Sequence, residues 1–135
     1  MIRSTVFAAL LLTCSGLLAQ DDQWRTEALK NCTKNQFTMN VCAVEDFKVA
    51  DKKLNSLFQE QLRRLTSKEG KQYLQAAQRA WILFRDKDCL YQAGPREGSG
   101  TIWTLEQYSC LKYHTDRRIE DIKRFVECTQ NGCPS

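Results

Sequence analysis

The most regular feature of the chain is a repeat of apolar residues at alternating spacings of three and four, which recurs in three long segments. The first segment runs from Thr38 to about Leu65, and its repeating positions are Ala43, Phe47, Ala50, Leu54, Leu57, Gln61 and Leu65. This spacing places residues on one side of a helix, and polar residues occupy the other side. The segment therefore predicts an amphipathic helix with Thr38 as its N-cap.

The second repeat follows Thr66–Ser67, which offers a hydroxyl N-cap, and extends to Cys89. Its apolar positions are Leu74, Ala77, Trp81 and Phe84. We expect this stripe to face the core of the protein. Gln78, Arg85 and Asp86 lie beside this stripe. We expect them to form a polar network near the helix end, with the aliphatic parts of their side chains on apolar surface and their polar groups in water.

Residues 93–100 contain three of the six glycines and one of the two prolines, so we expect a loop. After the loop, Thr101 or Thr104 is a candidate N-cap for a third helix that ends near Cys128. The apolar face of this helix consists of Leu105, Tyr108, Leu111, Thr115, Ile119, Ile122 and Val126. A short helix is also expected within Asp22–Asn31. Together the segments predict an all-α, antiparallel up-down-up three-helix bundle.

The first 19 residues have the features of a secretory signal peptide: the basic Arg3, an apolar run over residues 6–12, and small residues before Ala19. The apolar run is shorter than the ~20 residues that a membrane-spanning helix needs. We therefore expect cleavage after Ala19 and export to the periplasm or the cell exterior.

Cleavage would leave residues 20–135 as one domain, with its core within 32–128. Cys14 raises an alternative, since lipoprotein signals place a lipidated cysteine just after the apolar run. The preceding Thr13 is larger than the residue that such a signal prefers. A lipid anchor is therefore the less favoured prediction.

Six cysteines remain after removal of Cys14: Cys32, Cys42, Cys89, Cys110, Cys128 and Cys133. An even number in an exported chain predicts three disulfides, each stabilising a small core by ~2 to 4 kcal/mol. The predicted helices bring the first four cysteines to one end of the bundle, which permits more than one pairing. Because short loops close most readily, we favour Cys32–Cys42, Cys89–Cys110 and Cys128–Cys133.

The remaining composition gives little support for catalysis, metal binding or nucleic-acid binding. The chain has one histidine, His114, and no CxxC pair, so we expect no metal and no cofactor. Ser109 and Asp116 are not spaced to converge on His114 along a helix. Removal of the signal peptide leaves 19 basic and 16 acidic residues, a charge of +3, with both signs interspersed. We therefore expect neither an enzyme nor a nucleic-acid-binding protein.

Several positions, taken together, resemble the LprI-type lysozyme inhibitor family of small exported bacterial proteins. The resemblance covers roughly residues 32 to 122, and its most specific part is the pattern Trp81, Arg85, Asp86 and Cys89. The positions to which the resemblance assigns a structural role are Gln78, Trp81, Arg85, Asp86, Asp51 and Asn55. Residues 99–101 read Ser-Gly-Thr where the family tends to have Gly-Gly-Ser, and Cys128 and Cys133 are additions to four family cysteines.

The resemblance implies a protein that binds and inhibits lysozyme, an enzyme that cleaves with two carboxylates in a cleft. A net charge of +3 disfavours overall electrostatic attraction to a basic lysozyme. It remains compatible with a hydrogen-bond donor inserted at those two carboxylates. The candidate binding loop carries Arg96, Glu97, Ser99 and Thr101, and we expect Arg96 to pair with a carboxylate. The alternative is an interaction module for another envelope protein, without effect on lysozyme.

Overall fold

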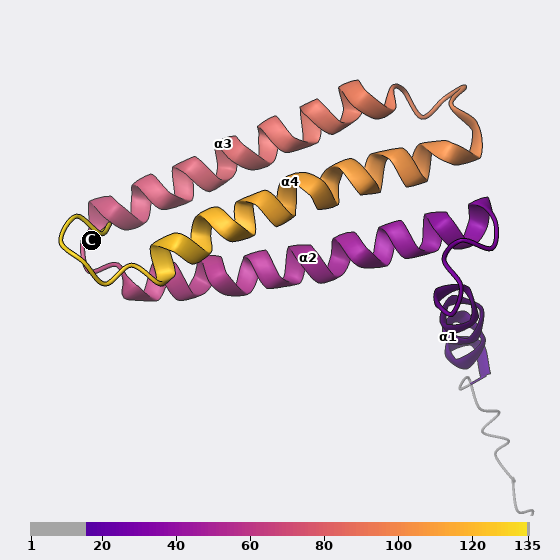
Figure 1. The fold of residues 1–135 in the computed structure, drawn as a ribbon, viewed down its shortest axis with the longest axis horizontal. Coiled ribbons are helices and arrows are strands. Elements are labelled where there is room, and N and C mark those ends of the chain that lie inside the picture. Colours follow the sequence, from indigo (N-terminus) through magenta and orange to yellow (C-terminus); the bar gives the residue numbers. More distant parts are fainter. Residues whose placement is uncertain (1–15, 135) are drawn as a thin grey trace, which may run out of the picture.

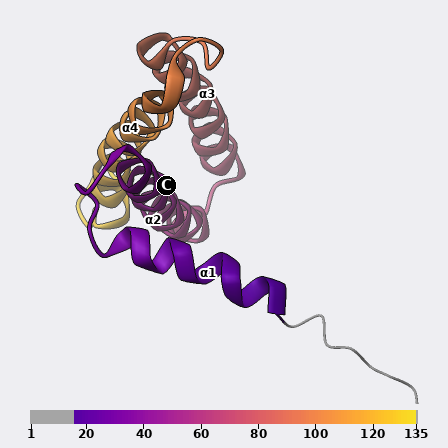
Figure 2. The same ribbon diagram turned by 90° about the vertical axis from the view of Figure 1, so that its right-hand side faces the viewer.

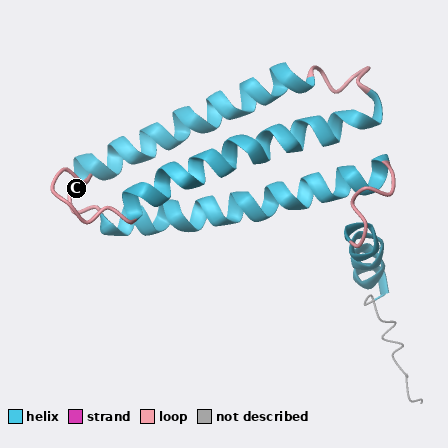
Figure 3. Cartoon of the chain, viewed as in Figure 1, coloured by secondary structure: helices cyan, strands magenta, loops and turns pink. Residues whose placement is uncertain are grey.

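The computed structural model describes residues 16–134. The regular structure of this part of the chain is entirely helical, with no strand (Figure 3). Its elements are α1 (Gly16–Leu29), α2 (Gln36–Arg64), α3 (Lys68–Ala93), a 3-10 turn η1 (Gly100–Ile102) and α4 (Trp103–Val126). The prediction of an all-helical chain is thus confirmed, and α1 covers most of the short helix expected before Cys32.

The predicted signal peptide lies largely outside the described residues, so its cleavage after Ala19 stays a prediction, as does lipidation of Cys14. None of the described helices combines the length and the apolar character that crossing a membrane requires.

The three long helices lie lengthwise beside one another, and α1 crosses the end where α2 begins (Figures 1 and 2). Followed along the chain, α2 and α4 run in one direction and α3 runs in the other. The connection between α2 and α3 is at one end of the molecule, and the loop between α3 and α4 is at the opposite end.

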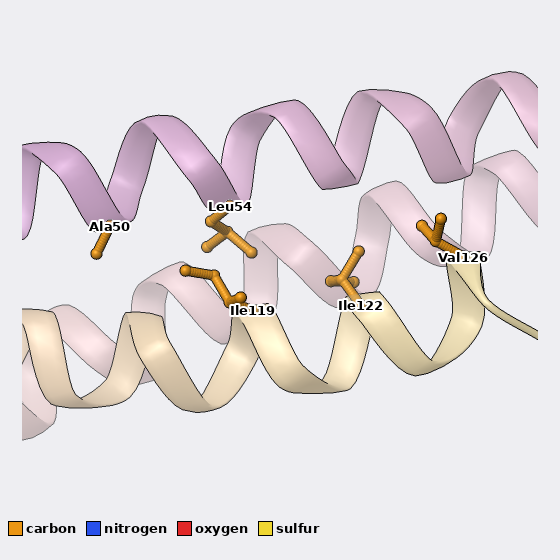
Figure 4. Packing of buried hydrophobic residues seen from close by; sticks show 5 residues of the cluster. All are labelled: Ala50, Leu54, Ile119, Ile122 and Val126. Atoms are coloured by element: carbon orange, nitrogen blue, oxygen red, sulfur yellow. The ribbon is translucent and has the colours of Figure 1, made fainter.

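The main apolar core lies between α2 and α4 (Figure 4). Its buried members are Ala50, Leu54, Ile119, Ile122 and Val126, with Leu57, Leu74, Trp81 and Phe125 packed against them. Burial of each large aliphatic side chain contributes roughly 1.5 to 3 kcal/mol. The apolar stripes predicted for these two helices are the ones that they bury.

The stripe predicted for α3 is wrong in part. Phe84 is 58% exposed and Ala77 is exposed as well, whereas Gln78 and Arg85 are buried with Cys89. The helix is therefore rotated from the expected orientation: the polar groups of Gln78 and Arg85, which we expected in water, are buried, whereas Asp86 is exposed as expected. Burial of Arg85 is possible because the neighbouring helices supply acceptors and aromatic rings for its guanidinium.

The helix caps explain where α2 and α3 begin. Asn35 caps α2 through its side-chain oxygen, which accepts a bond of 2.9 Å from the Thr38 backbone N–H, while the Thr38 hydroxyl accepts from the Asn35 N–H at 3.1 Å. This reciprocal pair starts the helix at Gln36, earlier than the predicted cap at Thr38. Ser67 caps α3 as expected, because its hydroxyl accepts from the Gly70 N–H.

The start of α4 was predicted incorrectly, since neither Thr101 nor Thr104 caps it. The N-cap position is Ile102, which makes no side-chain hydrogen bond there. The chain enters the helix through the 3-10 turn Gly100–Ile102, which continues directly into α4. At the other end of the loop, α3 stops at Gly94, whose positive φ of 72° suits glycine.

Candidate functional site

Three disulfides join the cysteines in the pairs that short loop closure favours: Cys32–Cys42, Cys89–Cys110 and Cys128–Cys133. The first two pairs lie at the end of the bundle where α1, the start of α2 and the loop between α3 and α4 meet. We call this region, with loop residues 94–102, the stapled end. Cys89 is fully buried, so its disulfide fixes the base of the loop from inside.

The loop is held in place by hydrogen bonds from outside its own segment. The Trp103 indole Nε1 donates to the Gly94 carbonyl at 2.9 Å, and the Asn40 amide donates to the Thr101 carbonyl at 2.8 Å. Within the loop, the Ser99 hydroxyl donates to the Pro95 carbonyl. The exposed loop of residues 94–102 is thereby fixed to α2 and α4.

The predicted binding residues share this loop but differ in their accessibility. Arg96, Glu97 and Thr101 are exposed, whereas Ser99 is half-buried by its bond to the Pro95 carbonyl. The Arg96 guanidinium carbon lies 5.4 Å from the centroid of the Trp103 ring. The ring thus orients the cation by a cation–π contact while leaving its donors open to solvent.

A hollow of about 360 Å³ lies beside the loop, between α1, α2 and the start of α4. Its apolar lining includes Trp24, Phe37, Val41 and Val44, and the Trp24 and Phe37 ring centroids are 5.7 Å apart. The sequence pattern did not predict this hollow, although Trp24 and Phe37 flank Cys32 and are 47% and 56% exposed. Two partly exposed aromatic rings beside a rigid loop form a surface suited to protein contact.

The rim of the hollow carries an ion-pair network that ties α1 to α2. Glu45 of α2 pairs with Arg25 of α1 and with Lys48, whose ammonium lies 2.8 Å from the carboxylate. Hydrogen bonds from Arg25 and then Lys48 lower the pKa of Glu45 below its ordinary value. Glu45 is therefore ionised, and its charge is compensated within the site.

Arg85 and Gln78, two of the motif residues that carry the family resemblance, are buried in the bundle, whereas Asp86 and Asn55 are exposed. The Arg85 guanidinium donates to the Asp86 carboxylate at 2.9 Å and to the Thr115 hydroxyl at 3.4 Å, and it lies 3.6 Å from an Asp51 oxygen. The Asp51 carboxylate also accepts from the Asn55 amide at 2.9 Å. These contacts connect α3 to α2 and α4 through one buried arginine.

Aromatic rings complete the surroundings of that arginine. The guanidinium carbon of Arg85 lies 5.0 Å from the centroid of Trp81 and 5.4 Å from that of Phe47. Trp81 also contacts Arg118, whose Nε donates to the side-chain oxygen Oε1 of Gln78 at 3.0 Å. Burial lowers the pKa of Arg118, although the Asp121 charge opposes this effect. We call the polar and aromatic residues around this arginine the arginine seam; they are Arg85, Asp51, Asp86, Thr115, Phe47, Trp81, Gln78 and Arg118. Arg85 itself is only 8% exposed, so its guanidinium is not available to a partner.

The histidine is occupied by a structural contact. His114 Nε2 lies 2.8 Å from a carboxylate oxygen of Asp88 on α3, while Asp116 pairs with Lys112 at 2.6 Å. The bond to Asp116 raises the pKa of Lys112. His114 also lies close to the sulfurs of Cys89 and Cys110, but a disulfide uses both sulfurs and leaves no thiolate to bind a metal.

Within residues 16–134, the structure thus defines a small helical protein that is stapled by disulfides and presents a fixed, charged loop. The chain belongs to the lysozyme inhibitor LprI family, whose family model matches residues 29–122. It is also similar to uncharacterized protein R02472 of Rhizobium meliloti (strain 1021), with 28% identity over 142 residues that cover 96% of this chain and all of the relative. No solved structure gave a significant match.

Proposed function

We propose that this protein is exported, binds a lysozyme through its stapled end and inhibits it, with Arg96 placed at the carboxylates of the lysozyme cleft. The observation that carries the proposal is the combination of the family match with an exposed arginine on a loop that is fixed at both ends. Three disulfides and the amino-terminal apolar run support export, since disulfides persist in oxidising compartments.

Arginine suits the proposed role because its planar fork of donors matches the two oxygens of a carboxylate. Lysozyme keeps two carboxylates in an open cleft for acid and nucleophile chemistry. A cation paired with either group would obstruct substrate entry, and one paired with the general acid would also interfere with proton transfer. The protein then acts by binding and occluding, without turnover of its own.

The fixed loop favours tight binding because less conformational freedom is lost on association. The Cys89–Cys110 disulfide holds the loop base, and the bonds to Gly94 and Thr101 hold its two halves. The hollow lined by Trp24 and Phe37 supplies apolar surface next to the charged loop. An exposed arginine on the Trp103 ring, with Trp24 and Phe37 in the neighbouring hollow, provides the residue types that dominate interface energies.

The experiment is a turbidity assay in which purified lysozymes of several structural types lyse bacterial cell walls. The parent protein is expected to slow lysis in a dose-dependent manner for at least one type. Arg96→Ala is expected to weaken inhibition about tenfold to a hundredfold, because a charge-assisted hydrogen bond contributes roughly 1.5 to 3 kcal/mol.

Arg79→Ala is the matched control, since it removes the same charge from an exposed position on α3. It is expected to inhibit as the parent does. If Arg96→Ala inhibits as well as the parent, the role of Arg96 is wrong. If the parent leaves every lysozyme unaffected, the protein instead serves as an interaction module for a different envelope partner.

A further inference from the structure

One side of α3 exposes a regular, mainly apolar stripe, of which Phe84 also contacts the His114 ring of α4 edge-on. Alternating spacings of four and three connect its members, which are Tyr73, Ala77, Ala80, Phe84, Lys87 and Tyr91. Tyr73 is 75% exposed and Tyr91 is 86% exposed, and all six residues are in the exposed class. This spacing is the one by which helices pack against each other lengthwise.

The stripe is large for a free surface. Its three aromatic rings and the flanking Leu83 and Leu90 expose on the order of 600 Å² of side-chain area, since each buried aromatic covers 150–250 Å². The contiguous apolar patches of monomeric proteins rarely exceed a few hundred Å². With the stem of Lys87 and the alanines added, the face approaches the ~800 Å² per partner of a standard protein interface.

The order of large and small residues makes this stripe complementary to itself. When two copies of α3 lie antiparallel about a two-fold axis level with residue 82, Phe84 of one copy lies level with Ala80 of the other. Lys87 then lies level with Ala77, and Tyr73 with Tyr91. Each bulky or long side chain at the centre meets an alanine, and the tyrosines meet at both ends. A two-fold interface requires this reciprocity, since residue i contacts j and j contacts i.

We propose that the protein forms a homodimer through this face of α3, as an antiparallel pair of helices. The area of the face and its self-complementary order identify a second copy of this chain as the occupant. The proposal is independent of lysozyme binding, since none of the stripe residues belongs to loop residues 94–102.

The test is sedimentation velocity of the full exported chain over a micromolar concentration range. The parent is expected to have twice the mass of one chain. Phe84→Arg is expected to raise the dimer dissociation constant at least about a hundredfold, because an arginine would be buried without a partner. Circular dichroism should show parent helicity for this variant, since Phe84 is exposed within one chain.

Val49→Arg is the matched control, because Val49 is 70% exposed on α2 and lies outside the stripe. It is expected to remain dimeric. A parent protein that is monomeric throughout the range would overturn the proposal. Dissociation by Val49→Arg, or a dimer unaffected by Phe84→Arg, would overturn it as well, since the interface would then lie elsewhere.

Two further variants test the antiparallel register. Ala77→Glu would place a carboxylate level with Lys87 of the second copy, so we expect the dimer to be retained. Ala80→Glu would place the same group against Phe84, so we expect the dissociation constant to rise at least about tenfold. Both alanines are exposed within one chain. Equal effects of the two variants would refute the register.

Discussion

The arginine seam makes a quantitative prediction about Arg85, whose truncation to alanine should strongly lower the free energy of unfolding. The Arg85 stem is buried, and loss of its Cγ and Cδ methylenes costs about 1.6 kcal/mol at ~0.8 kcal/mol each. Two cation–π contacts contribute about 1 kcal/mol each at a largely desolvated site. The hydrogen bonds to Asp86 and Thr115 add about 1 kcal/mol.

Part of this loss is offset, because removal of the guanidinium also removes the cost of burying it. The carboxylates left behind are accessible to water, at 39% exposure for the Asp51 side chain and 53% for Asp86, so they rehydrate with little penalty. The expected net effect of Arg85→Ala is therefore about 3 kcal/mol, at the low end of values for broken buried ion pairs. Arg85→Met keeps the stem and should cost about 1 kcal/mol.

The assay is urea unfolding at pH 7, followed by circular dichroism with the disulfides intact. Arg79→Ala is the control, and a surface change of this kind should stay within about 0.5 kcal/mol of the parent. If Arg85→Ala unfolds at the same urea concentration as Arg79→Ala, the seam does not hold α3 in place, and the reasoning is refuted.

Three other predictions concern the stapled end. Replacement of both Cys89 and Cys110 by serine should lower the free energy of unfolding by about 3 kcal/mol, as expected for a closed loop of 21 residues, and unchanged urea unfolding would contradict this. Glu45→Gln should lower stability at neutral pH only. The folded-state pKa of Glu45 lies below the ordinary 4.5, so the Glu45 charge contributes fully to the free energy of unfolding above that pH. This contribution is lost as the pH falls through the folded-state value, and the parent and variant unfolding curves should therefore converge in acid. Trp103→Phe removes the bond to Gly94 but keeps a ring, and it should weaken lysozyme inhibition several-fold while urea unfolding shifts by about 1 kcal/mol or less.

The helices of this protein were predictable where large aliphatic residues define the buried face. In α2 and α4, Leu54, Ile119 and Ile122 repeat at helical spacing and are buried as expected. The disulfide pairing followed from loop length, because each cysteine lies close to its partner along the chain. These features depend on residues that are close together in the chain, so the spacing of apolar residues and cysteines is enough to predict them.

The orientation of α3 was not predictable from spacing, because its buried face depends on residues far along the chain. Arg85 is buried against Thr115, 30 positions away, and Gln78 against Arg118, 40 positions away. The pattern of apolar residues instead favoured Phe84 as a core position, and the structure leaves Phe84 exposed.

The candidate loop was placed correctly between its helices, but its fixed conformation was not predictable. Its anchors are the amide of Asn40, 61 positions from the Thr101 carbonyl, and the indole of Trp103, which the apolar pattern of α4 did not include. The hollow beside the loop depends on how α1 lies across α2, and the sequence carries no local signal for that packing.

The most direct test of the proposed binding site is hydrogen–deuterium exchange of the protein alone and with an excess of an inhibited lysozyme. Complex formation should slow exchange in loop residues 94–102 and in the first turns of α2, where Phe37 and Val41 line the hollow. Exchange in the second half of α2, far from the stapled end, should stay unchanged. Protection confined to regions outside the stapled end, or no protection at all, would contradict the account.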